Sequence, residues 1–301
     1  MLHPNGRSGT LLLCWHVLHA LREDLLLAVV LTLLCHLVVP PALEQKLSPK
    51  VLLPLLGISV SVFTAFRNTQ AFQRWWDART HWACMVSASR EWRDGLIALQ
   101  SQPGQHPLWE LLNRRHVLIS WNLNSDLRGW MSASCEQATT QLEKELSVEP
   151  GRGRQRLLQD QACGMAELVK QGLINDGPSR VLLFTAHSRI LKAMGGLEQI
   201  QQQPMPPSYS LFIRLIVWFF GLLLFLRMDE ISHPHWSVVG FISLIGFVMA
   251  ERLGALLEDP FSSARFGLPM DHICAEISGD LLGQGHPSAV PAQGPKAQLW
   301  T

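Results

Sequence analysis

Four apolar stretches, arranged in two pairs, constrain this chain more than any other feature. They cover residues 25–39, 51–66, 211–226 and 236–250. As helices they would span roughly 22–24 Å each. This is shorter than the hydrocarbon core of about 30 Å, which takes about 20 residues to cross. Buried core helices can be this short, but polar turns at the ends can also extend a membrane helix. Because the stretches come in pairs with compact links, we predict a polytopic membrane protein with four membrane segments.

A large polar insert, residues 67–210, separates the two pairs and holds most of the Lys and Arg. Strand patterns are absent from it, and apolar residues recur at helical spacing. The expected helices cover residues 71–94, 111–128, 138–148, 154–171 and 178–194. Gly195 and Gly196 are expected to end the last of them. The sequence therefore predicts an all-α fold, with a helical domain between the two membrane pairs.

Arginines flank the predicted membrane segments asymmetrically, which favours one orientation under the positive-inside rule. They stand at Arg22, Arg67, Arg74, Arg79, Arg252 and Arg265. This pattern places both termini and the insert in the cytoplasm of a cell-membrane protein, although Lys46 and Lys50 in the first outer loop oppose it. The predicted regions are 1–66 with segments one and two, 67–210 cytosolic, 211–252 with segments three and four, 253–282 cytosolic, and a disordered tail at 283–301.

The second apolar segment runs into the polar insert at Arg67 with no turn signal between them. Large apolar residues recur every fourth position, at Ile58, Val62 and Phe66. Since positions i and i+4 share a helix face, these three form one smooth row. A row of this kind, ringed by copies of itself, could line a pore that gates ions by dewetting.

Small residues recur every fourth position beside that row, at Gly57, Ser61 and Ala65. Small residues allow helices to approach closely inside a membrane. We therefore assign these three positions to helix packing.

The junction continues as FRNTQAFQRWWDAR, from Phe66 to Arg79, followed by Trp82. This run resembles the signature of the bestrophin family, and of its bacterial branch in particular. Two further motifs agree, residues 195–209 before the third membrane segment and residues 258–261 after the fourth. The resemblance covers residues 22–282.

The resemblance implies a homopentamer around a central pore, with the second membrane segment lining it. Ile58, Val62 and Phe66 match the three apolar rings of the family's neck, and a second, cytosolic constriction falls near Ser179 and Val181. Relatives are best known for chloride, while bacterial members can favour monovalent cations. The implied partners are further copies of the chain, monovalent ions and the lipid bilayer.

Six charged, polar and aromatic residues follow the predicted neck, and we assign them structural roles as packing and family-motif residues. They are Arg67, Asn68, Arg74, Trp75, Trp76 and Asp77. The middle ring departs from relatives, because Val62 is smaller than their Ile or Phe, which predicts a slightly wider neck. Animal bestrophins bind Ca²⁺ with an acidic run after the fourth segment, but this chain has only Glu258 and Asp259 there. Because six to eight oxygen ligands are usual, calcium gating is not expected.

Other functional classes find less support in the sequence. A net charge of +1 argues against a nucleic-acid surface, and no phosphate loop or hydrolase motif indicates an enzyme. The six cysteines are scattered, so no metal site or disulfide framework is expected, and no cofactor is predicted. Two alternatives stay open. His16 and His19 share a helix face and could ligate haem, and the chain could instead be a non-conducting membrane scaffold.

Overall fold

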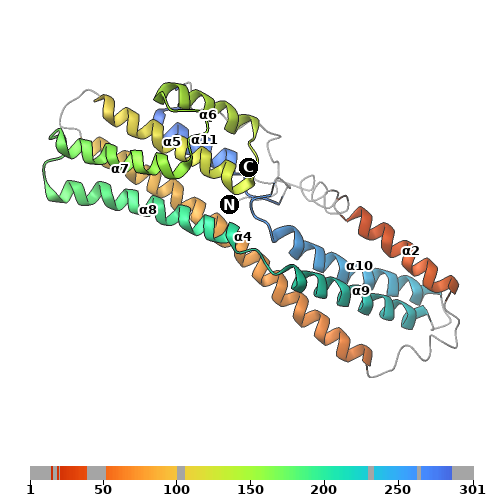
Figure 1. The fold of residues 1–301 in the computed structure, drawn as a ribbon. Coiled ribbons are helices and arrows are strands. Elements are labelled where there is room, and N and C mark those ends of the chain that lie inside the picture. Colours follow the sequence, from red (N-terminus) through yellow and green to blue (C-terminus); the bar gives the residue numbers. More distant parts are fainter. Residues whose placement is uncertain are drawn as a thin grey trace. The chain divides into compact units, whose positions relative to one another are not determined.

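The computed structural model describes residues 21–38, 52–99, 106–229, 234–262 and 266–286, with Trp15 and His19. Regular structure in these residues is entirely helical, which confirms the predicted all-α class (Figure 1). The expected outer loop at 40–50 and the tail at 287–301 lie outside the described residues. The helices are α2 (Arg22–Val38), α4 (Leu52–Ala98), α5 (Pro107–Arg128), α6 (Ala133–Leu146), α7 (Arg154–Lys170), α8 (Gly177–Gln202), α9 (Pro207–Asp229), α10 (Pro234–Leu257) and α11 (Met270–Leu282).

The described residues form two compact units, and helix α4 contributes to both. The first, called here the apolar unit, contains the described residues up to Trp75 together with Pro204–Asp259. The second, called the polar unit, contains Trp76–Gln203 and the described residues from Pro260 onward. Each unit has its own buried core.

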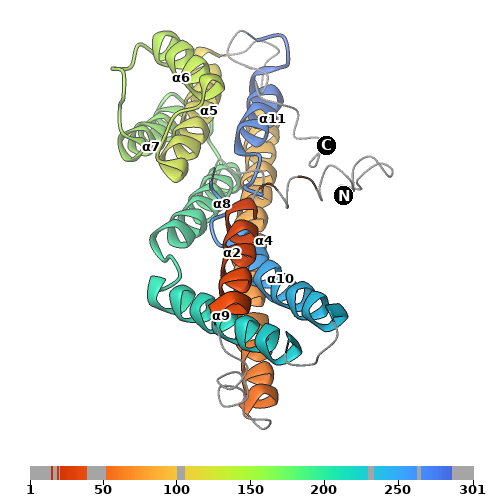
Figure 2. The same cartoon turned by 90° about the vertical axis from the view of Figure 1, so that its right-hand side faces the viewer.

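The apolar unit packs α2, α9 and α10 side by side (Figures 1 and 2). Glycines allow α9 and α10 to approach closely, because a Cβ on Gly221 would overlap the Leu244 side chain. The core also receives one residue from α2 and one from α4. Its buried members are Ala28, Val60, Ile213, Val217, Phe220, Leu244 and Val248.

Two helices of the apolar unit are long and apolar enough to cross a membrane, at Pro207–Met228 and Trp236–Leu257. They correspond to the third and fourth predicted segments. Large apolar side chains such as Leu211, Leu215 and Ile242 are exposed on them. Helix α2 and the beginning of α4 do not meet the same criterion within the described residues, so their membrane role stays a prediction.

The polar unit is built around α5, which contacts α6, α7, α8 and α11. Tryptophans dominate its core, with Trp82, Trp92 and Trp121 fully buried. Side-chain caps define where helices begin: the Ser132 side chain accepts a hydrogen bond from Cys135 N at the start of α6, and Asp176 accepts one from Ser179 N at the start of α8. Helix α8 begins within one residue of the predicted start at 178, whereas α6 begins five residues before the predicted start at 138.

One predicted helix end is wrong. Helix α8 does not stop at Gly195 and Gly196 but continues to Gln202. The reason is tertiary packing, because the His81 ring of α4 occupies the space that a Cβ on Gly196 would need. Gly196 therefore serves a close helix approach rather than a helix stop.

Candidate pore helix and its charged anchor

Within the apolar unit, α4 buries one side and exposes another. Val60, Thr64 and Arg67 are buried at helical spacing against the rest of the chain. Ile58, Val62 and Phe66 lie on the other side and are 65%, 45% and 61% exposed. The chain therefore leaves the predicted neck row free of its own core.

Of the small-residue row, only Gly57 packs closely within the single chain. Gly57 packs against the Phe220 ring, since a Cβ there would come within 3.1 Å of Phe220 Cζ. Ser61 and Ala65 are exposed in the single chain. Close packing inside the chain is thus seen at Gly57, and the packing role of the other two stays a prediction.

Arg67 directly follows the predicted neck row in sequence and lies in a buried ion network. Its Nη1 donates to Glu251 Oε1 at 2.6 Å, and its Nη2 donates to Glu258 Oε2 at 3.1 Å. The side chains of Arg67 and Glu251 are each only 3% exposed, whereas that of Glu258 is 25% exposed. Ser210 Oγ of α9 donates to Glu258 Oε2 at 3.4 Å. A buried guanidinium is tolerated here because carboxylates take its charge and hydrogen bonds.

Asn68 joins the same helix junction from the next position. Its Nδ2 donates to the Ala250 carbonyl oxygen at 2.9 Å. Gly254, one turn further along α10, has no room for a Cβ, which would overlap Asn68 Oδ1. The C-terminal part of α10 is therefore held directly against α4.

The Arg-Trp-Trp motif also makes contacts within the chain. Arg74 Nε donates to the Glu258 carbonyl oxygen at 3.0 Å, and Trp75 is buried. Trp76 is exposed and carries the Arg79 guanidinium 5.6 Å from its ring centroid, a cation–π contact.

The remaining predicted site residues belong to the polar unit. Asp77 is exposed on α4. Ser179 lies in the first turn of α8, where its backbone N–H donates to Asp176 Oδ2 at 2.8 Å, and Val181 follows with 65% of its surface exposed. An exposed apolar side chain at a helix start is compatible with a constriction built by several copies of the chain.

Sequence reasoning missed the acidic partners of three arginines in the apolar unit, Arg67, Arg214 and Arg252. Asp24 pairs with Arg214 and Arg252, and Glu251 pairs with Arg67. The available signal was the acids at the edges of two apolar stretches, namely Glu23 and Asp24 before the first and Glu251 after the fourth. Ionisable residues in such places usually pair with one another.

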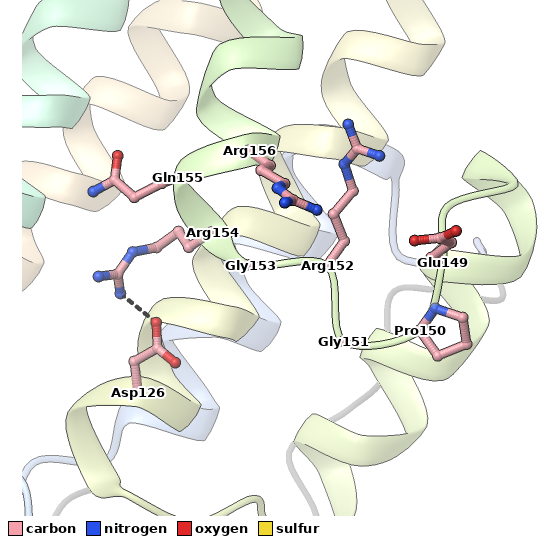
Figure 3. A pocket seen from close by; sticks show the side chains of 9 residues that line it. All are labelled: Asp126, Glu149, Pro150, Gly151, Arg152, Gly153, Arg154, Gln155 and Arg156. Carbon is pink, nitrogen blue, oxygen red and sulfur yellow. Dashed lines mark ion pairs between the residues drawn. The ribbon is translucent and has the colours of Figure 1, made fainter.

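A pocket of about 470 Å³ opens in the polar unit at the start of α7 (Figure 3). Its arginines are largely compensated within the chain. Arg154 Nη1 lies 2.8 Å from Asp126 Oδ2, and Arg152 Nη2 lies 2.8 Å from Asp160 Oδ2. Among the described residues, no group of three or more His, Cys, Asp or Glu side chains could hold a metal ion.

The model of the bacterial and fungal bestrophin proteins matches residues 8–282 of this chain. The chain belongs to the bacterial/fungal bestrophin family. The resemblance drawn from the Phe66–Arg79 run is thereby confirmed.

Bestrophin relatives match along most of their length. A voltage-dependent anion channel-forming protein of Mesorhizobium japonicum is 27% identical over 79% of this chain and 77% of its own. The voltage-dependent anion channel-forming protein YneE of Salmonella typhi is 24% identical over 97% and 96%. The crystal structure of a bacterial bestrophin homologue from Klebsiella pneumoniae is 22% identical, with a TM-score of 0.75 over 91% of this chain and 100% of that one. The structural likeness shows that the fold is shared.

Proposed function

We propose that this chain forms a bestrophin-like channel that conducts small monovalent anions passively across a cell membrane. One observation carries the proposal: α4 turns Ile58, Val62 and Phe66 away from the chain's own core. Relatives that match most of the chain are named as anion channel-forming proteins, which supports the ion class.

The proposed channel is a pentamer with four membrane segments in each chain. Helices α9 and α10 supply two of them, and α2 and the first turns of α4 supply the others. A single helix cannot enclose a pore, so the exposed row needs copies of itself around a symmetry axis. Both termini and the polar unit then lie in the cytoplasm.

The neck would act by dewetting. Ile58, Val62 and Phe66 carry no charge, so their rings set the diameter and the hydration cost rather than the sign of the ion. Charges at the inner mouth would select the sign, by changing the local ion concentration. The direction of flow follows the electrochemical gradient, with no covalent step.

Reversal potentials in asymmetric NaCl across a planar bilayer test the proposal. An anion channel shifts the reversal potential towards the chloride equilibrium value, whereas a shift towards the sodium value would replace anion by cation selectivity. Absence of ion flux from liposomes that contain the folded protein would favour a non-conducting scaffold. A Soret absorbance band in the purified protein would instead favour a haem protein.

The neck assignment has its own test in Val62→Phe. A ring of larger side chains narrows the pore and lowers single-channel conductance, because ions meet a narrower and less hydrated constriction. Ser59→Ala is the matched control, since Ser59 lies off the exposed row and donates its hydroxyl to the Leu55 carbonyl oxygen of its own helix. Equal conductance in Val62→Phe and the parent protein would remove Val62 from the neck.

A further inference from the structure

Asp24 lies where three helices of the apolar unit meet. Its Oδ1 accepts hydrogen bonds from Arg214 Nη2 at 3.2 Å and from Arg252 Nη2 at 2.8 Å, and its Oδ2 accepts one from Arg252 Nε at 2.5 Å. Glu251 is 4.0 Å from Arg252, but its own hydrogen-bonded partner is Arg67. Two guanidinium groups therefore share Asp24. Arg252 also has Glu251 as a second, more distant carboxylate, whereas Asp24 is the ion-pair partner of Arg214 within the described residues.

Arg214 is the more open of the two cations. Its side chain is 42% exposed, compared with 26% for Arg252 and 5% for Asp24. A guanidinium has five N–H donors, and only one of them reaches Asp24. Leu211 and Leu215 on the same helix are 57% and 60% exposed. Within the described part of the chain, Asp24 is the ion-pair partner of Arg214, and the donors that do not reach it stand beside an apolar surface.

The three charged groups lie at matching ends of their helices. Asp24 is near the start of α2, and Arg252 is near the end of α10. Arg214 lies roughly 10 Å from the start of α9 at 1.5 Å per residue. Helical side chains lean towards the helix N-terminus, so the Arg214 guanidinium is directed towards the end of α9 that follows the polar unit. A long cationic side chain in this place reaches the lipid headgroup layer.

We propose that Arg214, with Arg252 behind it, binds the phosphate of an anionic phospholipid in the inner leaflet. The proposal rests on the membrane orientation of the proposed function. The headgroup phosphate accepts hydrogen bonds from the Arg214 donors that do not reach Asp24, and the acyl chains cover the exposed Leu211 and Leu215. Basic sites between membrane helices on the cytoplasmic side bind headgroups of this class.

Competition between two lipids tests the site. The purified full-length oligomer is offered equal amounts of phosphatidylglycerol and phosphatidylcholine, and bound lipid is counted by native mass spectrometry. We expect about a fivefold preference for phosphatidylglycerol, the effect of one cation near a membrane surface. Arg214→Gln should abolish the preference, and Arg214→Lys should keep it.

Two controls separate this site from general charge and from free phosphate. Arg156→Gln removes the same charge from an exposed position of the polar unit and should leave the preference unchanged. An excess of inorganic phosphate should not displace phosphatidylglycerol, because it lacks the acyl chains. Displacement by phosphate, or an equal loss in Arg156→Gln, would overturn the proposal.

Other outcomes are also decisive. An unchanged preference in Arg214→Gln sinks the lipid site, and dissociation of the oligomer with unchanged lipid counts would assign Arg214 to a neighbouring subunit instead. If Arg214→Gln does not fold, loss of the preference in Arg214→Lys overturns the site. Ion flux is measured separately, so a conducting protein without lipid preference overturns only this inference, and a lipid-binding protein without flux overturns only the channel.

Discussion

Arg67 illustrates how single residues hold the end of the proposed neck. Its charge is buried between Glu251 and Glu258, so removing it would take from the buried Glu251 carboxylate its hydrogen-bonded cation and leave only Arg252 at 4.0 Å. The stabilising contribution of such a pair lies mainly in avoiding that uncompensated charge. Residues in this position are therefore intolerant of single changes and more tolerant of paired ones.

We predict that Arg67→Met lowers the free energy of unfolding by about 3–5 kcal/mol. Arg90→Met is the control, because Arg90 pairs with Glu276 and Asp280 at the surface, where a pair contributes about 0–1 kcal/mol. Denaturation of both variants in detergent provides the comparison. Equal losses of unfolding free energy in the two variants would contradict the distinction between buried and exposed ion pairs.

His116 makes the polar unit sensitive to acid. Burial lowers the pKa of His116 to about 3, with the His187 ring nearby as a smaller cause, and its Nε2 lies 2.8 Å from Ser89 Oγ. The unfolded chain binds a proton near the ordinary pKa of about 6.5, so it takes up more protons than the folded chain below that pH. Stability is therefore full above about pH 6.5 and is lost as the pH falls towards 3.

We predict a loss of about 2 kcal/mol from His116 alone between pH 7.5 and pH 5. His116→Gln should reduce this pH dependence, because a glutamine amide can replace the contact between Nε2 and Ser89 Oγ without titrating in this range. His272→Gln, at an exposed position of α11, should leave it unchanged. Unfolding followed by circular dichroism at the two pH values measures the effect. An identical change in unfolding free energy between pH 7.5 and pH 5 in the parent protein and both variants would refute it.

At the scale of the helix, α8 shows how neighbouring glycines serve different purposes. Gly195 faces open space, whereas Gly196 faces the His81 ring. We predict that Gly195→Ala stabilises the protein by about 0.5–1 kcal/mol through helix propensity. Gly196→Ala should destabilise it by about 1–3 kcal/mol through overpacking. Thermal midpoints of the two variants should shift in opposite directions, and a shared direction would contradict the packing seen at His81.

Helix α4 shows what local pattern can and cannot predict. The spacing of Ile58, Val62 and Phe66 places them on one face in any helix, and the structure leaves that face exposed. The opposite face, with Val60 and Thr64 buried, was not predicted. Val, Thr and Ser differ little in a local pattern, so the choice of the packed face depends on which helices come to lie against it.

At the scale of the whole molecule, the proposed pore exists only in an assembly. We predict a native mass of five chains for the detergent-purified protein, measured by native mass spectrometry. Five copies close a ring in which each α4 presents the same row to the axis. A monomeric or dimeric mass in a protein that still conducts would contradict the pentamer.

The sequence by itself determined the helical class, the apolar stretches, the row at Ile58, Val62 and Phe66, and the family motif that follows it. These features depend on residue type and on spacing within a few turns. Only the tertiary structure decided the partners of the buried charges. Arg67 meets Glu251 across 184 residues, and Asp24 meets Arg252 across 228. No local period encodes such contacts, because they arise only when helices far apart in the sequence pack together and each buried charge must find its opposite.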